Sequence, residues 1–462
     1  YLDNAATTQM PQPVLDALQH FERHDRANIH RGVHALSQRA TDAYDAARAE
    51  LKRFVGAGAG HELVFTSGTT ESLNLVAHGL SAHAGGSKPL QRGDEIIVSG
   101  LEHHANLLPW QRAARESGAV LRILLPDAEG HLHAEDLARL LSPRTRVFAV
   151  TACANATGER PPVAELLALA RQAGALTVLD AAQVAAHAVP DISALPCDFL
   201  VFSGHKMYGP MGTGALVGAR NALELLAPLR VGGDMVEWVS FTDASYAALP
   251  ARLEAGTPNV GGAIGMAAAA KFIDAVGRSA IDQHLHALRH QAVQGLAALP
   301  GLRVLSPDTQ DTAIVSFVTE GVHPPLCPAI AGTSGLWADD PRVVRALQHT
   351  GRSRAPGRGR GQGAGAFAMS SAETDLYQEL VLEHKRAPRN FGHLLAPTHQ
   401  ARGTNPSCGD DLSVELNIAD GRLADIRFHG QGCAICMASA SMMSEAVKGQ
   451  EIATAQALQQ HF

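Results

Sequence analysis

The chain has 462 residues, of which 46% are apolar and 18% are charged, and its formal net charge is −7. These values are typical of a globular protein, allow two or three domains and give no reason to expect a nucleic-acid partner. No apolar stretch reaches spanning length and no signal peptide is recognised, so we expect no membrane partner and a cytoplasmic location. Six cysteines are too few for a disulfide framework, and three cluster late, which favours thiol or metal chemistry: Cys408, Cys433 and Cys436.

Between residues 40 and 220 the pattern alternates helices with short apolar strands. The predicted strands are Leu63–Phe65, Glu95–Val98, Val120–Leu124, Arg146–Val150 and Thr177–Leu179. Loop and helix signals follow each of them, and such a βα succession predicts a mostly parallel sheet with helices on both faces. Ligands of these sheets bind at the carboxyl ends of the strands, so polar residues at those ends are the candidates for a site.

Two polar residues stand at such strand ends. Lys206 follows a Ser203-Gly204 turn after the apolar run Asp198–Phe202, so its amine can enter a sheltered pocket. Desolvation there would lower the pKa of the amine and make it a Schiff-base nucleophile. Asp180 ends another apolar run, Ala175–Leu179, and a carboxylate there can keep a pyridinium nitrogen protonated. Either residue alone would be interpreted as a surface lysine or a turn aspartate; together they indicate pyridoxal phosphate chemistry.

Three further loops supply what such a site needs. The segment Ser67–Glu71 lies between a strand and a helix, where backbone N–H groups, hydroxyls and the helix dipole can hold a phosphate dianion. His103 follows another strand and can stack on a ring and shuttle protons, and Asn155 can donate to a phenolic oxygen. A lone loop histidine or asparagine is more often structural, but five such pieces at successive strand ends favour a cofactor site.

The chain changes character towards its C-terminus. Residues 262–298 are predicted to form one or two Ala-rich helices, and strands at Arg303–Leu305 and Ala313–Phe317 predict a smaller second domain. Residues 324–368 carry alternating Gly and Arg with little periodicity, which indicates a linker or disorder rather than a nucleic-acid contact. A third unit begins at Met369, and its expected elements are the helix Asp375–Lys385, strands Leu412–Leu416 and Ile426–Phe428 around the turn Asp420-Gly421, and the helix Ala434–Val447.

Four segments carry a resemblance to a known family. Tyr1–Thr8, Asn28–His34, Leu101–Asn106 and Arg252–Asn259 resemble the Suf-type cysteine desulfurases of the class V aminotransferase group, and the similarity covers residues 1–323. The resemblance implies an α/β fold, that of the fold-type I pyridoxal 5'-phosphate-dependent transferases, with a mostly parallel sheet covered on both faces. It also implies a small α/β domain, which is truncated in this chain.

The same resemblance implies a role for each candidate residue. Lys206 would carry the cofactor and act in catalysis with His103, which stacks on the ring. Asp180 would pair with the ring nitrogen, while Asn155 and Gln183 would reach the phenolic oxygen. The phosphate is expected to bind four side chains, Thr69, Thr70, Ser203 and His205, and the threonine at position 257 would reach the phosphate of a neighbouring subunit. A homodimer is therefore implied, with L-cysteine as the substrate and alanine plus an enzyme-bound persulfide as the products.

One part of the family pattern is missing. The persulfide cysteine of the family lies in a Gly-His-His-Cys-Ala-Gln-Pro motif, followed by an Arg-x-Ser-Phe…Tyr-Asn-Thr strand whose arginine binds the substrate carboxylate. Neither occurs here, and Cys327 stands in different surroundings, Pro324–Ala329. Suitable codons for residues 324–350, read one nucleotide later, give both motifs. The hypothesis is a deletion and frameshift after His323, with reading continued into a second coding sequence at Met369, so that this chain would have little or no desulfurase turnover.

The third unit resembles the U-type iron–sulfur assembly proteins, an α+β, NifU-like fold. By that resemblance Cys408, Asp410 and Cys433 would bind zinc, or a transient iron–sulfur cluster, and the metal-bound thiol would accept sulfur from the desulfurase. Cys436 is an extra thiol, expected to be buried in a helix. Other iron–sulfur assembly proteins are the expected partners of this unit.

The resulting domain division has four parts. A large cofactor-binding domain is expected at 1–260, a partial small domain at 261–323, a linker at 324–368 and a C-terminally truncated U-type domain at 369–462. The leading interpretation is a cysteine desulfurase joined to a U-type sulfur acceptor. Two alternatives stay open: a selenocysteine lyase or related class V lyase, and a non-catalytic scaffold that binds the cofactor and a metal.

Overall fold

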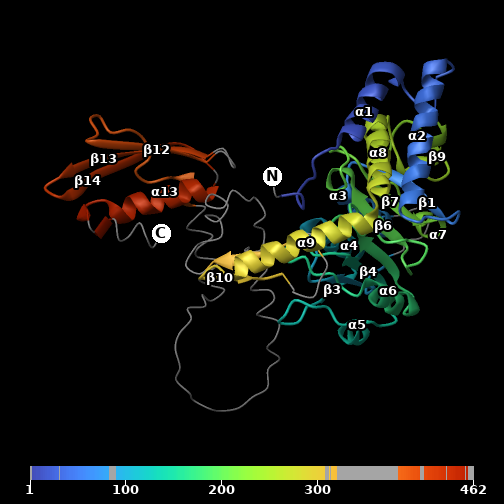
Figure 1. The fold of residues 1–462 in the computed structure, drawn as a ribbon, viewed down its shortest axis with the longest axis horizontal. Helices are drawn as coiled ribbons and strands as arrows, with labels where there is room; N and C mark the ends of the chain where they lie inside the picture. Colours follow the sequence, from blue (N-terminus) through green and yellow to red (C-terminus); the bar gives the residue numbers. More distant parts are fainter. Residues whose placement is uncertain are drawn as a thin grey trace, which may run out of the picture. The chain divides into compact units, whose positions relative to one another are not determined.

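The computed structural model describes residues 3–30, 32–82, 90–306, 312, 314–319, 383–384, 386–405, 410–432, 434–452 and 454–455. The chain divides into two compact units, residues 1–354 and residues 355–462. Figure 1 shows the elements of both units coloured along the chain.

A seven-stranded sheet forms the centre of the first unit. Its strands lie in the order β1-β7-β6-β5-β4-β2-β3. Their bounds are β1 His61–Thr66, β2 Glu95–Ser99, β3 Val120–Leu124, β4 Thr145–Thr151, β5 Leu176–Asp180, β6 Phe199–Ser203 and β7 Gly214–Ala219. β7 pairs antiparallel with both β1 and β6, whereas the other neighbouring pairs are parallel. The predicted mostly parallel sheet is therefore confirmed.

Helices cover both faces of this sheet (Figure 1). Successive strand residues point to opposite faces, so Ile96 and Val98 pack against α3 and α4, while Ile97 packs on the side of α5 and α6. The bounds of these helices are α3 Thr69–Ser81, α4 Leu108–Ser117, α5 Ala134–Leu140 and α6 Val163–Gln172, and the short α7 is Arg220–Leu223. Because both faces are buried, the strands are almost continuously apolar, as expected of parallel sheets.

Three further helices pack together at one end of the first unit. α1 Gln12–His20 and α2 Ala35–Phe54 both pack on α8 Val260–Val276, whose small residues permit close approach. A π-helical turn, Phe21–Asp25, extends α1. The Ala-rich stretch forms two helices, because Gly277, with φ +91°, separates α8 from α9 Arg278–Ala297. Among the described residues no single helix is long and apolar enough to cross a membrane; α8 and α9 meet that test only together, across a 78° bend.

Two small sheets complete the described part of the first unit. β8 Val236–Val239 pairs with β9 Ala244–Tyr246, and β10 Leu302–Val304 pairs with β11 Phe317–Thr319. The strand predicted at Ala313–Phe317 was therefore wrong in position, since its described residues before Phe317 are not in a strand. Side-chain hydroxyls accept two of the backbone N–H groups there: Ser316 N–H donates to Ser306 Oγ at 2.7 Å and Ile314 N–H to Thr312 Oγ1 at 3.3 Å. One backbone bond, from Leu305 N–H to the Ser316 carbonyl at 2.7 Å, continues beyond the paired residues of β10.

The C-terminal unit contains a three-stranded antiparallel sheet with a helix on one face. β12 His399–Asn405, β13 Asp410–Ala419 and β14 Arg422–Gln431 lie in that order, and the helix is α13 Ala434–Val447. Asp420 and Gly421 both have positive φ, at 51° and 74°, which confirms the predicted turn between the strands. The predicted helix Asp375–Lys385 lies mostly outside the described residues, although Glu383 and His384 are helical. Residues 324–368 also lie outside them.

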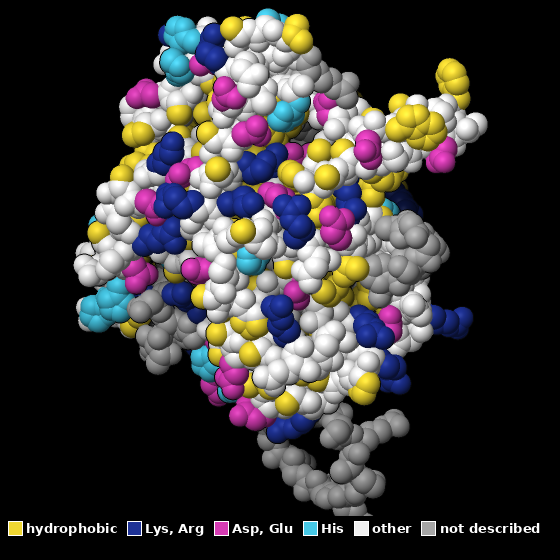
Figure 2. Space-filling view, turned by 90° about the vertical axis from the view of Figure 1, so that its right-hand side faces the viewer, with side chains coloured by type: hydrophobic (Ala, Val, Ile, Leu, Met, Phe, Trp, Pro, Cys, Tyr) yellow, Lys and Arg dark blue, Asp and Glu magenta, His cyan; other side chains and the backbone are white. Residues whose placement is uncertain are grey.

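Charged side chains of both signs mingle at the surface. On the face shown in Figure 2, Lys and Arg side chains lie among Asp and Glu side chains. Many such groups are paired in the first unit; Glu95, for example, bonds Arg122 at 2.9 Å and Arg144 at 2.7 Å.

Candidate active site

The strand ends chosen from the sequence meet at one edge of the large sheet. β2, β4, β5 and β6 run parallel, and β1 shares their direction because it is antiparallel to the antiparallel β7. Their carboxyl ends therefore lie side by side at one edge. Each leads directly into one predicted site segment, in sheet order Thr69-Thr70 after β1, Ser203–Lys206 at β6, Asp180 at β5, Asn155 after β4 and His103 after β2.

The N-terminus of α3 forms a cradle beside the end of β6. Thr69 N–H and its hydroxyl both lie 2.8 Å from Ser203 Oγ, so the two segments are joined. The N-cap residue, Gly68, has no side chain to cap the helix, and in the described part of the chain the first-turn N–H groups of Thr70 and Glu71 have no hydrogen-bond acceptor. Such N–H groups at a helix N-terminus attract a phosphate dianion.

Two glycines bring the backbone close to this cradle. Gly68 has φ +152°, a conformation that other residues rarely adopt, and a Cβ there would lie 3.3 Å from Ser203 Oγ. A Cβ at Gly214, the first residue of β7, would lie only 2.5 Å from the Cα of Gly68. The two glycines therefore allow the backbones of β7 and of the turn before α3 to approach more closely than any larger side chain would permit.

The charges of Lys206 and Asp180 interact at this edge of the sheet. Burial lowers the pKa of Lys206, and the charges of Asp180, Cys153 and Asp3 partly oppose that shift. Asp180 is 4% exposed, and burial raises its pKa. Two effects oppose that rise: Ala182 N–H donates a hydrogen bond to Oδ1 at 2.9 Å, and Lys206 carries a positive charge. Within the described residues, Oδ2 of Asp180 accepts no hydrogen bond. A carboxylate oxygen that accepts no hydrogen bond from these residues is available to a protonated ring nitrogen.

The N-terminal segment holds the lysine turn in place. The backbone carbonyl of His205 accepts hydrogen bonds from Thr8 N–H at 2.8 Å, Thr8 Oγ1 at 2.9 Å and Thr7 Oγ1 at 3.2 Å. Gln183 Nε2 donates to the Ala5 carbonyl at 3.1 Å, so the side chain expected to reach the cofactor also fixes this segment. The motif at the start of the chain thus positions the residue next to Lys206.

His103 lies on the turn after β2, next to the buried carboxylate of Glu102. Its Nδ1 accepts a hydrogen bond from Ala105 N–H at 3.1 Å, and burial, with the charges of Lys206 and His104, lowers its pKa. Both observations favour the neutral ring.

Sequence reasoning missed Glu102, whose carboxylate lies beneath this turn. It accepts hydrogen bonds from Thr151 N–H at 2.6 Å, Ser99 Oγ at 2.5 Å and Asn106 Nδ2 at 2.6 Å. Burial raises the pKa of Glu102 to about 8, and the charge of Asp180 adds to the rise, while the Ser99 and Asn106 hydrogen bonds oppose it. The turn that carries His103 is therefore tied to both β2 and β4.

The remaining predicted residues lie at the same edge or on the loop after β9. Asn155 is half-buried in the turn after β4, and burial together with the charge of Lys206 lowers the pKa of His205. Thr257 is exposed, on a loop that Glu254 anchors by accepting from Arg48 at 2.7 and 2.9 Å. That exposure leaves the Thr257 hydroxyl accessible from outside this subunit.

The predicted metal ligands cannot be placed in the same way. Cys408 and Cys433 lie outside the described residues, and of Asp410 only the backbone, at the start of β13, is described. Cys436 lies on α13 and is half-buried.

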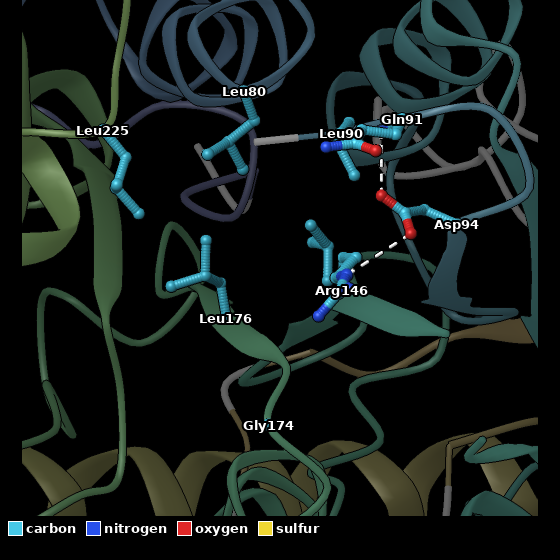
Figure 3. Close-up of a pocket in the computed structure, with 9 residues that line it drawn as sticks. Leu80, Leu90, Gln91, Asp94, Arg146, Gly174, Leu176 and Leu225 are labelled. Carbon is cyan, nitrogen blue, oxygen red and sulfur yellow. Dashed lines mark hydrogen bonds and ion pairs between the residues drawn. The ribbon is translucent and has the colours of Figure 1, made fainter. Parts of the chain in front are cut away.

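A surface pocket of about 230 Å³ lies at the opposite edge of the large sheet. Asp94, Arg146 and Leu176 stand at the beginnings of β2, β4 and β5, far along each strand from the cradle; Figure 3 shows them with the other lining residues. Asp94 Oδ1 pairs with Arg146 Nε at 3.3 Å and Oδ2 accepts from Gln91 N–H at 2.8 Å, so the polar groups satisfy one another. The pocket contains none of the predicted site residues.

Comparison with known proteins gives a match for each unit. Residues 1–336 match the family model of the class-V aminotransferases, and residues 376–461 match that of the NifU-like N-terminal domain. The chain is 43% identical over 349 residues to a cysteine desulfurase of Synechococcus elongatus, and the match covers 76% of this chain and 54% of that protein. The chain thus spans about half the length of that relative. It is 42% identical over 349 residues to a probable cysteine desulfurase of Vibrio cholerae, with 76% and 83% covered.

Solved structures agree with the family match. The apo structure of a cysteine desulfurase from Thermococcus onnurineus superposes with a TM-score of 0.70 at 37% identity, covering 75% of this chain and 87% of that one. This likeness, together with the NifU-like match, confirms the fold expected from the sequence.

Proposed function

Because this chain belongs to the class-V aminotransferase family, in its cysteine desulfurase branch, and carries a NifU-like domain, we propose that it binds pyridoxal 5'-phosphate and L-cysteine for iron–sulfur cluster assembly. The observation that carries the proposal is the meeting of five predicted site segments at one sheet edge. The proposal keeps the division expected from the sequence: a large domain at 1–260, a partial small domain at 261–323, a linker at 324–368 and a U-type domain at 369–462.

The residues present fit the cofactor that the family implies. The cradle at the start of α3 suits its phosphate, with Thr69, Thr70, Ser203 and His205 as the ligands. Oδ2 of Asp180, which accepts no hydrogen bond from the described residues, suits the protonated ring nitrogen, and His103, Asn155 and Gln183 would face the ring and its phenolic oxygen. When bound, the cofactor supplies an electron sink for the deprotonated substrate.

Each residue contributes a definite property to the chemistry. Burial keeps a fraction of the Lys206 amine neutral and therefore nucleophilic, and the Thr7 and Thr8 bonds to the preceding carbonyl orient it. Because Nδ1 of His103 accepts a hydrogen bond from Ala105 N–H, the proton of the neutral ring lies on Nε2 and can be donated from there. Nε2 can accept a proton only after the Ala105 bond breaks and the ring adopts the Nδ1-protonated tautomer. Burial raises the pKa of Asp180, and the Ala182 N–H bond and the charge of Lys206 oppose that rise, so a protonated ring nitrogen beside it would further stabilise the charged carboxylate.

The sulfur acceptor is the step at which this chain departs from its family. The Gly-His-His-Cys-Ala-Gln-Pro motif is absent from the sequence. Cys153 interacts with the charge of Lys206, but it is 2% exposed and burial raises its pKa, so its thiolate is scarce. Cys197 is fully buried, and burial raises its pKa to about 12. We therefore infer cofactor binding with little turnover of L-cysteine, since loss of a nucleophile costs orders of magnitude in rate.

The test combines a spectrum with a product assay on the full chain. Added pyridoxal 5'-phosphate should give the visible band of a lysine-linked cofactor in the wild type and in Lys271→Ala, a control on the exposed face of α8, but not in Lys206→Ala. Addition of L-cysteine should then release little alanine and leave no persulfide. Absence of the band in the wild type would refute cofactor binding, and alanine release at the rate of an intact desulfurase would refute the inactivity.

The missing motif favours one second function, a cofactor-loaded scaffold without turnover. The visible band without alanine from either cysteine or selenocysteine would establish it, whereas alanine from selenocysteine alone would indicate a lyase. The underlying DNA decides the frameshift hypothesis: codons 324–350 must give both family motifs in one shifted frame, and any other sequence excludes it.

For the C-terminal unit we propose a sulfur-acceptor role with zinc or a transient cluster on Cys408, Asp410 and Cys433. Support comes from the NifU-like match over residues 376–461, which includes all three. Thiolates and one carboxylate are suitable zinc ligands.

A further inference from the structure

Two histidines and a glutamate meet on one face of the C-terminal sheet. His429 lies on β14 opposite Ser413 of β13, so Glu415, two residues further along β13, shares the face of His429. His393 comes from the segment before β12. The other face of the sheet carries Leu416 and Ile426, which pack against α13, so the cluster lies on the side away from that helix.

The three donor atoms have the spacing of ligands around one ion. Glu415 Oε1 lies 3.1 Å from His393 Nδ1 and 3.3 Å from His429 Nε2, and the donor atoms of all three residues lie within 4.8 Å of one another. Zinc bonds of about 2.0–2.2 Å at tetrahedral angles separate neighbouring donor atoms by about 3.3 Å. The observed spacing therefore requires little rearrangement to bind an ion.

The glutamate is already oriented for this purpose. Leu394 N–H donates to Glu415 Oε2 at 2.6 Å, which leaves Oε1 directed at the two imidazoles. The side chain of Glu415 is 10% exposed, whereas those of His429 and His393 are 27% and 69% exposed. A held carboxylate beneath two increasingly exposed imidazoles gives an ion a route from solvent and leaves one side of it open.

We propose that His393, Glu415 and His429 bind one divalent transition-metal ion of the zinc type, with a water at the open position. Two imidazoles and a carboxylate suit zinc and its neighbours better than magnesium or calcium, which prefer oxygen ligands throughout. The site uses none of the residues proposed for the thiolate site, Cys408, Asp410 and Cys433, and it does not depend on desulfurase activity. A simple ion-paired cluster without metal affinity is the competing explanation.

Cobalt(II) distinguishes the two explanations, because its spectrum reports the ligand type. In the full chain with Cys408→Ser and Cys433→Ser, Co²⁺ should bind with d–d bands in the visible region and without a thiolate charge-transfer band. His393→Gln and His429→Gln should each weaken this binding by at least about tenfold, the loss seen when even an outer partner of a metal ligand is removed. His399→Gln, a histidine on β12 of the same sheet, is the matched control and should bind as before.

The outcomes separate cleanly. Zn²⁺ should displace Co²⁺ in the parent and the control with a stoichiometry of one. Co²⁺ binding that is absent, or that is equal in parent, His393→Gln and His429→Gln, would overturn the site. His393 is mostly exposed, so its variant should keep the circular dichroism of the parent, and a loss of binding there reports the ligand and not unfolding.

Discussion

At the scale of single residues, burial decides which side chains at the sheet edge can do chemistry. Lys206, His103 and His205 all have pKa values lowered by burial, which favours their neutral forms, while burial raises the pKa of Asp180. Shifts in these directions, gathered at one strand edge, are typical of a functional site. Glu102 belongs to the same group, although it contacts the turn of His103 and not the cradle.

Glu102 should make the stability of the first unit depend on pH. Its pKa is about 8 in the folded chain against an ordinary value of 4.5, so between these values the folded state binds the extra proton. The stabilisation is complete below about pH 4.5 and is lost as the pH rises through about 8, by up to about 1.4 kcal/mol per pH unit. Glu102→Gln should remove this slope.

Urea unfolding at several pH values tests the slope. All three tryptophans lie in residues 1–354, so intrinsic fluorescence follows the first unit. Glu116→Gln, which alters an exposed pair with Arg112, serves as control and should keep the wild-type slope. Equal slopes in the wild type and Glu102→Gln would contradict the assignment.

The sequence identified the candidate residues that follow strands but did not identify Glu102, which supports one of their turns. Lys206 and Asp180 stand out because each follows an apolar run, Asp180 directly and Lys206 after a short turn, and local sequence carries that signal. The role of Glu102 depends on joining Ser99 of β2 to Thr151 of β4, and Thr151 is distant from both in the chain, so no local sequence pattern indicates that role. Glu415 and His429 were missed for the same reason, because only the pairing of β13 with β14 brings them together.

At the scale of elements, strongly apolar strands were predicted well and small or polar ones were missed. The strand Val120–Leu124 and the helix Ala434–Val447 have the bounds expected from sequence. β7 was missed because glycines occupy it at Gly214 and Gly218, where the neighbouring backbone leaves no room for a Cβ. β12 was missed because it is mostly polar and lies in a small sheet whose register sets it.

The loop that carries Thr257 depends on one buried ion pair. Glu254 accepts from Arg48 in two bonds and from Phe65 N–H at 2.6 Å, and the paired side chains are 10% and 13% exposed. Glu254→Gln would leave the Arg48 charge buried without its partner, so the free energy of unfolding of the first unit should fall by about 3–5 kcal/mol. Cofactor affinity should fall with it if Thr257 reaches the phosphate of a neighbouring subunit.

The control is a surface ion pair that also joins an arginine to a carboxylate. Arg53 pairs with Asp274 at 2.6 Å but is 57% exposed, so Arg53→Gln should cost no more than about 1 kcal/mol. Both variants are compared by urea unfolding followed by tryptophan fluorescence. A loss at Glu254 no larger than that at Arg53 would show that the pair does not hold the loop.

At the scale of the whole molecule, the division at 323 and 369 stays a prediction, because residues 320–382 lie outside the described part. The composition alone indicated where the periodic sequence ends and the Gly- and Arg-rich stretch begins. The two family matches, 1–336 and 376–461, lie on either side of residues 337–375. A change in composition identifies a non-globular stretch but carries no information on how the flanking units are arranged.

The β8–β9 hairpin carries an exposed apolar surface that would suit the predicted homodimer. Trp238, Val239 and Phe241 are 56%, 63% and 109% exposed, an apolar cluster that a single subunit leaves in water. If a second copy covers it, Trp238→Glu with Phe241→Glu should shift the molar mass from that of two chains to that of one, 48.5 kDa. Leu395→Glu, equally exposed at 108% but in the C-terminal unit, is the control and should keep the dimer.

Light scattering during size-exclusion chromatography measures the mass, and the visible spectrum of added pyridoxal 5'-phosphate measures the site. Because the exposed Thr257 hydroxyl would complete the phosphate site of the neighbour, the monomeric variant should also bind the cofactor more weakly than Leu395→Glu does. A wild type that is already monomeric, or a hairpin variant that stays dimeric, would show that this hairpin does not form the interface. A monomer with unchanged cofactor affinity would place the phosphate site wholly within one chain.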